Sequence, residues 1–368
     1  MHIRRIELTN FRNYEKIKLE NLDNINIIIG NNGIGKTSIL ESIYVASTCR
    51  TFKSNDEGVL VNSNKDFFKV KVDIENNGKI KKLDYILTDN GKKTKINNIL
   101  KKRISDYIFQ YKVILFSPDE MKLIKESPNV RRNYLNVSLS QINKSYMKLL
   151  KDYNVLIKNK NEYLKRMYVN SNMDSRYLDI IDEKIAEIGS EICKIRSEYI
   201  SKINKYLRKN FQKFRRNDNV YVKYSSQFLD KDKKEIVSLL KKNRDSEMNL
   251  SLTRTGIHRD DFLFIFEGND LKLYGSQGMQ RIAILSFKLS EINLFKERCG
   301  TYPIVLLDDI FSEIDIDKRR NLLRFIKSNI QFIITTTDIN NISEKLISKA
   351  SIFTVDNGSI KKRRDSYE

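Results

Sequence analysis

The stretch Gly30-Asn31-Asn32-Gly33-Ile34-Gly35-Lys36-Thr37 decides the fold class of this 368-residue chain. It matches the pattern G-x-x-x-x-G-K-[ST] of a phosphate-binding loop. The apolar run 25–29 before it predicts a buried strand, and the apolar spacing of residues 38–46 after it predicts a helix. Such a strand, glycine turn and helix N-terminus direct backbone N–H groups and the positive end of the helix dipole at an anion. The sequence therefore predicts a site for a nucleoside triphosphate.

The residue types in this loop each have an expected task. The glycines allow the backbone to approach the phosphates closely, which a Cβ atom would obstruct. Lys36 is expected to reach the β and γ phosphates, and the Thr37 hydroxyl is expected to ligate Mg²⁺.

A second part of the site is expected at the end of the apolar run 303–307, which is followed by Asp308 and Asp309. A strand buried on both faces would put Asp308 at the C-terminal edge of a parallel sheet, beside the phosphate loop. Asp308 would hold Mg²⁺ directly or through water, and Asp309 could orient or deprotonate the attacking water. We therefore predict Lys36, Asp308 and Asp309 as catalytic residues, with Thr37 and Asp308 at the metal.

A further anion site is expected at Ser276, Gln277 and Gly278, a turn of small residues before the apolar helical run 282–289. Ser276 as N-cap would give a second helix N-terminus suited to an anion. One chain rarely needs two such sites for one triphosphate. We therefore expect this turn to complete the site of a second copy of the chain in a homodimer.

The remaining sequence predicts an α/β head with an inserted helical arm. Alternating runs and turns in the first hundred residues indicate an antiparallel sheet beside the nucleotide-binding core. The segment 137–250 contains no proline, only one glycine, and apolar residues at three-four spacing. These features predict two long helices packed as a coiled-coil-like hairpin, with a partner-binding face as the alternative. The expected domains are residues 1–130 and 252–368 for the ATPase head and 131–251 for the arm.

The chain is strongly basic, with 68 Lys and Arg against 47 Asp and Glu and a formal net charge of +21. Such a positive field commonly serves a nucleic-acid backbone, although a lysine-rich genome composition would have a similar effect. Residues 205–216 mix basic and aromatic side chains, which is typical either of phosphate contact with base stacking or of a solvated helix face over core phenylalanines. The tail 361–364 is expected to be disordered.

The location of the chain is expected to be cytoplasmic. Its three cysteines are far apart in the sequence, which argues against a zinc site or a disulfide framework and favours a reducing compartment. The N-terminus lacks the apolar segment of a signal peptide, and no apolar run approaches membrane-spanning length.

Several motifs occur in the same order as in one known family. Beside the phosphate loop these are NFRNYE (10–15), FSPDEMKLIKESPNVRRNYLN (116–136), GIHRDDF (256–262), YGSQGMQR (274–281), LLDDIFSEID (306–315) and FIITTTD (332–338). With them the chain resembles the ABC-type ATPase heads of the SMC/Rad50 class and, within it, the RecF family of bacterial recombination mediators. SMC and Rad50 proteins are far longer and carry a hinge or a zinc hook that is missing here. The helical arm matches only loosely.

The resemblance implies roles for named positions. Gly30 to Thr37 would be the Walker A loop, Asp308 the Walker B magnesium ligand and Asp309 the catalytic carboxylate. Ser276 to Gly278 would be the signature turn that meets the γ-phosphate held by the opposite subunit. Residues 312–315 resemble the D-loop, and Thr336 and Thr337 stand at the switch position. Three residues depart from the family pattern: Met279 replaces Gln, Glu126 replaces Gly and Asn136 replaces Asp.

The resemblance also implies a function. Proteins of this family form ATP-dependent dimers, use ATP and Mg²⁺, hydrolyse ATP slowly, and bind single-stranded DNA, double-stranded DNA or their junction. They assist RecA loading at replication gaps together with RecR and RecO, which links them to the SOS response and to the nucleoid. We therefore expect a weak, DNA-stimulated ATPase that acts as a switch. The alternatives are an ATPase subunit of another SMC/Rad50-like complex, a membrane-transporter ATPase, and a small-molecule kinase.

Overall fold

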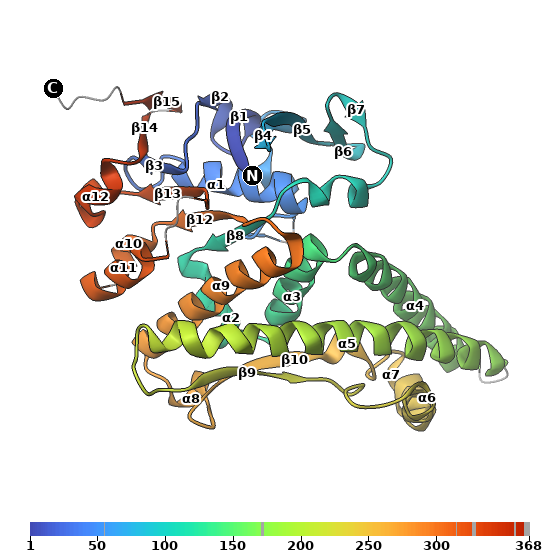
Figure 1. Ribbon diagram of the computed structural model, residues 1–368. Coiled ribbons are helices and arrows are strands. Elements are labelled where there is room, and N and C mark those ends of the chain that lie inside the picture. The colour runs from blue at the N-terminus through green and yellow to red at the C-terminus, as the bar shows by residue number, and fades with distance from the viewer. Residues whose placement is uncertain (55, 171–172, 314, 326–328, 357, 364–368) are drawn as a thin grey trace. The chain divides into compact units, whose positions relative to one another are not determined.

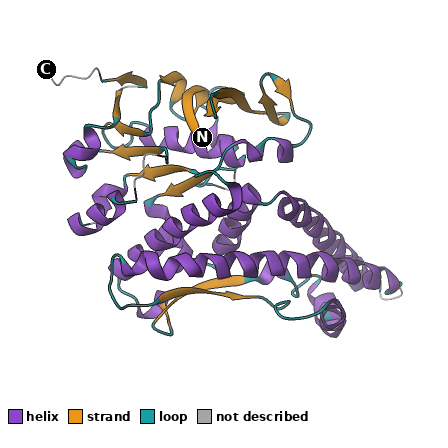
Figure 2. Ribbon diagram, viewed as in Figure 1, coloured by secondary structure: helices purple, strands orange, loops and turns teal. Residues whose placement is uncertain are grey.

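The computed structural model describes residues 1–54, 56–170, 173–313, 315–325, 329–356 and 358–363. The chain forms two compact units (Figures 1 and 2). The first contains Met1–Glu120 and Lys288–Glu368, and the second contains Met121–Phe287. The segment 131–251, expected as an arm, lies within the second unit, which begins earlier and ends later in the chain.

The first unit contains a six-stranded sheet in which every neighbouring pair is parallel except the edge strand β15. Its strands in spatial order are β15 (Ser359–Lys362), β14 (Ser351–Asp356), β3 (Ile25–Ile29), β13 (Phe332–Thr336), β12 (Ile304–Asp308) and β8 (Val113–Phe116). Every residue of β3, β8, β12 and β13 is buried, because a central parallel sheet is covered on both faces. The predicted strands at 25–29 and 303–307 are therefore both present. The tail was expected to be disordered, but Lys361 and Lys362 belong to β15; residue 364 lies outside the described residues.

The second sheet of this unit is antiparallel, as the sequence predicted. Its strands in spatial order are β2 (Tyr14–Glu20), β1 (His2–Phe11), β4 (Phe67–Asn76), β5 (Lys79–Thr88), β6 (Gly91–Ile96) and β7 (Ile99–Leu100). Burial alternates along β4, where Phe68, Val70 and Val72 face the core. Asn77 and Gly78 join β4 to β5 with φ angles of 50° and 74°, which the tight hairpin turn requires.

Helix α1 (Lys36–Thr48) packs against strands of both sheets. Its buried side chains include Ile39, Leu40 and Ile43. Because α1 follows β3 directly, this packing fixes the phosphate loop at the C-terminal end of the parallel sheet. The other α-helices among the described residues that lie wholly in this unit are α10 (Ile310–Glu313), α11 (Ile316–Leu323) and α12 (Glu344–Ile347).

The second unit is built on the predicted helical hairpin, formed by α4 (Lys144–Val169) and α5 (Arg176–Gln212). Each helix buries one apolar stripe, such as Tyr153 and Leu164 on α4 and Ile185 and Ile192 on α5. The other α-helices in the described part of the unit are α2 (Lys122–Lys125), α3 (Pro128–Ile142), α6 (Lys233–Lys242), α7 (Arg244–Leu250) and α8 (Leu271–Tyr274), together with the start of α9 (Gln277–Cys299). The predicted α/β fold with a helical insertion is therefore confirmed.

The second unit also contains a three-stranded antiparallel sheet that the sequence analysis missed. Its strands in spatial order are β11 (Asn269–Asp270), β10 (Asp261–Phe266) and β9 (Val220–Ser225). Strand β9 lies in a segment expected to be helical, although Val220 and Val222 alternate with exposed residues as a strand requires. Phe211 is fully buried and its ring lies 6.1 Å from that of Phe266. Of the two interpretations of residues 205–216, the core interpretation therefore holds for Phe211.

The two acids of the GIHRDDF motif hold the second unit together. Asp260 pairs with Arg196 at 2.6 Å, and both side chains are buried. Asp261 receives a bidentate pair from Arg131 at 2.6 and 2.9 Å. Asn136, where the resemblance leads us to expect Asp, accepts hydrogen bonds at its Oδ1 from Tyr146 at 2.6 Å and Arg196 at 2.9 Å. The amide oxygen of Asn136 thus accepts the two hydrogen bonds that a carboxylate oxygen could accept at this position.

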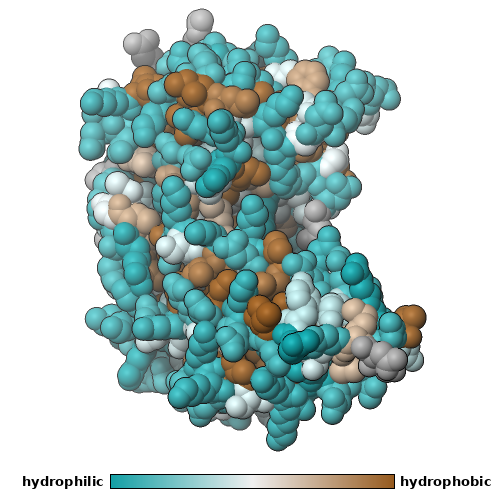
Figure 3. All heavy atoms as spheres, turned by 90° about the vertical axis from the view of Figure 1, so that its right-hand side faces the viewer, coloured by the Kyte–Doolittle hydropathy of each residue, from teal (hydrophilic) through white to brown (hydrophobic). Residues whose placement is uncertain are grey.

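Hydrophilic residues cover most of the face drawn in Figure 3. Within the described ranges, no helix combines the length and the apolar character that a membrane-spanning helix needs.

Candidate nucleotide-binding site

The phosphate loop connects the end of β3 at Ile29 to the start of α1 at Lys36. Gly33 and Gly35 have φ angles of 78° and 109°, in the left-handed region that glycine adopts most easily. A Cβ atom on Gly35 would lie 2.6 Å from the Tyr14 hydroxyl oxygen, and one on Gly30 would lie 2.9 Å from the Val355 carbonyl oxygen. Glycine at Gly30 and Gly35 is therefore required by the packing around the loop.

Lys36 is held by the loop itself. Its Nζ donates hydrogen bonds to the carbonyl oxygens of Gly30 at 2.7 Å and Asn31 at 2.8 Å. Burial lowers the pKa of Lys36, while the carboxylates of Asp309 and Asp308 act in the opposite direction. The side chain is thus a buried ammonium group positioned at the phosphate loop and near two acids.

Asp308, the last residue of β12, is hydrogen-bonded to the phosphate loop. Its Oδ1 accepts one hydrogen bond from the Thr37 hydroxyl at 2.9 Å and another from the Thr335 hydroxyl at 2.8 Å. Strand β13 lies between β3 and β12, so Thr335 bridges the gap that separates Asp308 from the loop strand. Burial raises the pKa of Asp308, and the two hydroxyl donors oppose that shift. The predicted proximity of Thr37 and Asp308 is therefore present.

Asp309 has a positive φ angle and a carboxylate oxygen that lacks a hydrogen-bond partner among the described residues. Its φ angle is 50°, and its N–H donates to Thr335 O at 3.2 Å and Thr335 Oγ1 at 3.1 Å. Its Oδ1 is buried without a hydrogen-bond partner among the described residues. A buried carboxylate oxygen without a donor is costly, so this atom is suited to a bound water or cation.

The N-terminus of α1 adds a positive partial charge to this group. Gly35 is its N-cap, and no side chain of the described residues caps the helix. The first-turn N–H groups point toward the loop, as they do where helices bind phosphate. Ammonium, N–H groups, a hydroxyl and two acids therefore meet in one place, and this donor set fits a triphosphate with a divalent cation.

The predicted signature turn belongs to the second unit, whereas the phosphate loop belongs to the first. Ser276 and Gln277 are exposed, and Ser276 Oγ accepts a hydrogen bond from the N–H of Met279 at 3.3 Å at the start of α9. Behind the turn, Gln280 Nε2 donates to the carbonyl oxygens of Leu271 and Gly275, each at 3.1 Å. Ser276 thus acts as the expected N-cap.

Among the other positions matched by resemblance, Ser312 contacts Asp309. Ser312 donates to the carbonyl oxygen of Asp309 at 2.7 Å, and Asp315 caps α11; residue 314 between them lies outside the described residues. Thr336 donates to the carbonyl oxygen of Asp338 at 2.9 Å, and Thr337 follows the end of β13.

Sequence reasoning missed one polar group that supports α1. The fully buried Glu41 accepts a bidentate pair from Arg12 at 2.9 and 3.1 Å and a hydrogen bond from Thr51 at 2.6 Å. Arg12 lies in the NFRNYE motif, and Glu41 lies on the helix that follows the phosphate loop. These two positions could have indicated the pair from the sequence. This group ties the β1–β2 turn to the helix that carries Lys36 and Thr37.

Comparison with known proteins identifies the family. The RecF/RecN/SMC N-terminal domain family matches residues 2–361. A protein of Clostridium perfringens named DNA replication and repair protein RecF is 36% identical over 364 residues, covering 98% of this chain and 99% of its own. A protein of the same name from Ligilactobacillus salivarius is 35% identical over 368 residues, covering 98% and 97%.

Solved structures agree with these relatives. A structure of the recombination mediator protein RecF with ATP, described as part of the RecFOR pathway, has a TM-score of 0.91 and 30% identity. It covers 99% of this chain, which in turn covers 98% of that structure. An SMC head bound to the C-terminal winged-helix domain of ScpA has a TM-score of 0.56 at 13% identity, which shows a shared fold alone. The chain therefore belongs to the RecF family of DNA replication and repair proteins.

Proposed function

We propose that this chain is an ATP-dependent, DNA-binding recombination mediator that acts in DNA replication and gap repair. The observation that carries the proposal is the hydrogen bond between Thr37 and Asp308, which unites the phosphate loop with the acidic strand end. Family membership supports it, since the similar solved structure is named as RecF with ATP.

Within this proposal ATP binds at the phosphate loop, with Gly30 to Thr37 around the phosphates and Lys36 at the β and γ phosphates. Thr37 and Asp308 would hold Mg²⁺, which would offset the negative charge of those phosphates. Asp309 would accept a hydrogen bond from a water molecule through its unpartnered Oδ1 and orient or deprotonate it. Hydrolysis would be weak, and it would serve as a switch.

ATP would also join two copies of the chain. Ser276, Gln277 and Gly278 of one copy would complete the site on the other, because the first turn of α9 offers a second anion-binding helix end. Leu273 and Tyr274, just before this turn, are 72% and 73% exposed. Both large side chains would be available to contact the second copy, and tyrosine is enriched at protein interfaces. Such a homodimer would bind a pair of ATP molecules.

DNA is the proposed target of the net charge of +21. The substrate would be single-stranded DNA, double-stranded DNA or their junction at a gap. RecR and RecO would be the protein partners, with RecA loaded downstream. The similar solved structure is described as part of the RecFOR pathway, which supports this assignment.

The test is DNA binding to gapped, duplex and single-stranded DNA, each without nucleotide, with ADP and with ATP. We expect ATP to increase the affinity for DNA, because closure of the dimer would align the basic surfaces of two copies. Equal DNA affinity in all three nucleotide conditions would contradict an ATP-dependent mediator.

A further inference from the structure

Helix α4 carries a row of lysines that the nucleotide site does not use. Lys144, Lys151, Lys158 and Lys165 follow one another at intervals of seven residues, and Lys148 lies between the first two. Seven residues make nearly two helical turns, so these side chains share one face over about 32 Å. All five are exposed. The row therefore runs along most of the helix on its solvent side.

This row is poorly balanced by acids. Lys148, Lys151 and Lys165 form no ion pair within the part of the chain that the structure describes. Lys158 lies 3.8 Å from Glu162, and both side chains are more than half exposed, which makes that pair weak. The face thus keeps most of its positive charge available.

The neighbouring helix shows that this is not a uniform excess of lysine. Up to residue 198, the exposed charged residues of α5 mix both signs: Arg176, Glu183, Lys184, Glu187, Glu191, Lys194 and Glu198. Over this part of α5 the two helices of the hairpin thus differ in the charge that they present to solvent, whereas the exposed charged residues farther along α5 are basic: Lys205, Arg208 and Lys209. Composition alone does not account for the row on α4.

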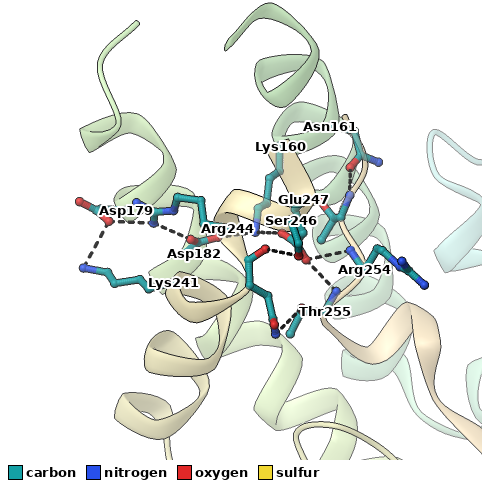
Figure 4. Close-up of polar contacts among 12 residues, drawn as sticks. Lys160, Asn161, Asp179, Asp182, Lys241, Arg244, Ser246, Glu247, Arg254 and Thr255 are labelled. Atoms are coloured by element: carbon teal, nitrogen blue, oxygen red, sulfur yellow. Dashed lines mark hydrogen bonds and ion pairs between the residues drawn. The ribbon is translucent and has the colours of Figure 1, made fainter. Parts of the chain in front are cut away.

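A loop adds one arginine beside the row. The N–H of Thr253 donates to Asn161 Oδ1 at 2.7 Å, and Asn161 lies three residues after Lys158 and four before Lys165. Since such spacings make neighbours on a helix surface, the loop lies next to these two lysines. The side chain of Arg254 is exposed and points away from the polar network around Glu247 (Figure 4).

A buried charge network fixes this loop. Glu247 Oε1 accepts hydrogen bonds from the N–H groups of Arg254 and Thr255, each at 2.8 Å. Glu247 is in turn paired with Lys160 at 2.8 Å, and Lys160 also pairs with Asp182 at 2.9 Å (Figure 4). The side chains of Lys160, Asp182 and Glu247 are fully buried. The backbone that carries Arg254 is therefore held in one position on the hairpin.

We propose that Lys148, Lys151, Lys158, Lys165 and Arg254, here called the α4 basic face, bind the phosphates of a DNA backbone. The proposal rests on the proposed function and adds the surface through which the helical hairpin contacts DNA. Lysine contacts to phosphate fix position without reading sequence, so this face would bind DNA of any sequence. DNA is favoured over an anionic membrane, because a membrane-surface helix needs a continuous exposed apolar face and the apolar stripe of α4, with Tyr146, Tyr153 and Leu164, is buried in the second unit. Val155, Tyr168 and Val169 of α4 are more than half exposed, and the vesicle measurement described below tests them.

The experiment compares two variants that each lose three positive charges. The first combines Lys151→Gln, Lys158→Gln and Lys165→Gln. The control combines Lys231→Gln, Lys233→Gln and Lys234→Gln at the start of α6, where acids balance the lysines: Asp230, Asp232 and Glu235. Figure 1 shows α6 and α4 on different sides of α5. DNA affinity is measured by fluorescence anisotropy on duplex and single-stranded DNA, with ATP, over a range of salt concentrations.

Each lost phosphate contact on duplex DNA lowers the salt slope of the binding constant by about 0.9. For the first variant we expect that slope to fall by about 3 and the affinity at 0.1 M salt to fall about tenfold or more. The control variant should keep the slope of the unaltered protein. Arg254→Gln alone should lower the slope by about 1 while thermal unfolding stays unchanged.

Three results would overturn the proposal. If the triple α4 variant bound DNA with the same salt slope as the control, the α4 basic face would not be the DNA-binding surface, and the proposed function would still stand. If the triple α4 variant lost binding to anionic phosphatidylserine vesicles but kept its DNA binding, the α4 basic face would be assigned to a membrane. Absence of DNA binding by the unaltered protein under all nucleotide conditions would overturn both this proposal and the proposed function.

Discussion

The Thr37 hydroxyl donates a hydrogen bond of 2.9 Å to Asp308 Oδ1, across 271 positions of sequence. The entire second unit is inserted between these two residues. The candidate site therefore forms only when both ends of the chain have folded into one sheet. A change that disturbs either end should affect nucleotide binding.

Lys36→Met should weaken ATP binding by about tenfold to a hundredfold. The reason is that hydrogen bonds to a charged group contribute about 1.5–3 kcal/mol, and the variant removes the ammonium group from the phosphate loop. Isothermal titration with ATP measures the loss. Lys16→Met, at an exposed position of β2, serves as the control and should bind ATP like the unaltered protein. Equal affinity in the two variants would reject the assignment of Lys36.

Asp308→Asn should stabilise the nucleotide-free protein increasingly as the pH rises. Burial raises the pKa of Asp308 above its ordinary value of 3.8, so the folded state binds this proton more tightly than the unfolded chain. The stability that this bound proton gives the folded state is fully present below pH 3.8 and is lost as the pH rises through the raised pKa. Asparagine does not titrate, and its side-chain oxygen can still accept from Thr37 and Thr335.

Urea unfolding from pH 3.5 to pH 7 would measure this difference. The free energy of unfolding of Asp308→Asn, relative to the unaltered protein, should increase over that range. Asp356→Asn, at an exposed site on β14, provides the control. If the free energy of unfolding of Asp308→Asn, relative to the unaltered protein, stayed constant or fell with pH, the pKa of Asp308 would not be raised by burial.

Ser276→Arg should prevent ATP-driven dimers while each monomer still binds ATP. The added side chain would project from the exposed turn at the start of α9, where the second copy is proposed to dock. Ser201→Arg, at an exposed position of α5, is the matched control. Light scattering with ATP would measure the mass of each variant. Normal dimers of Ser276→Arg would contradict the proposed contact between the signature turn and the opposite ATP.

Lys160→Met should lower the free energy of unfolding by about 3–5 kcal/mol, because Asp182 and Glu247 would lose the cation between them while remaining buried. Lys158→Met is an unusually close control: it lies two residues away on the same helix but is exposed, and its ion pair is weak. Urea unfolding compares the two. Similar stability of both variants would show that the buried network contributes little.

The parts of the site that could be predicted were those with a local pattern. The strand, glycine loop and helix around Lys36 follow from neighbouring residues alone, and the buried strand before Asp308 is an unbroken apolar run. Thr335 could not be chosen from the sequence, because three threonines follow one another at 335–337. Strand register decides which one faces Asp308, and register depends on the pairing of β13 with β12, in which Thr335 is 27 positions from Asp308.

The second unit shows the same limit in another form. The hairpin of α4 and α5 could be predicted because its apolar stripes repeat over many turns. Strand β9 has only six residues, and its alternation was hidden beside a long helical pattern. The Arg196–Asp260 pair is also non-local, since nothing near Arg196 in the sequence marks it as a buried cation.

Sedimentation velocity tests the central claim that ATP joins two copies of this chain. The unaltered protein and Asp309→Asn, which should retain ATP for longer, would be run without nucleotide, with ADP and with ATP, each with Mg²⁺. We predict a species of twice the monomer mass with ATP only, and a larger share of it for Asp309→Asn. A single monomeric species under all three conditions, in both proteins, would contradict the account.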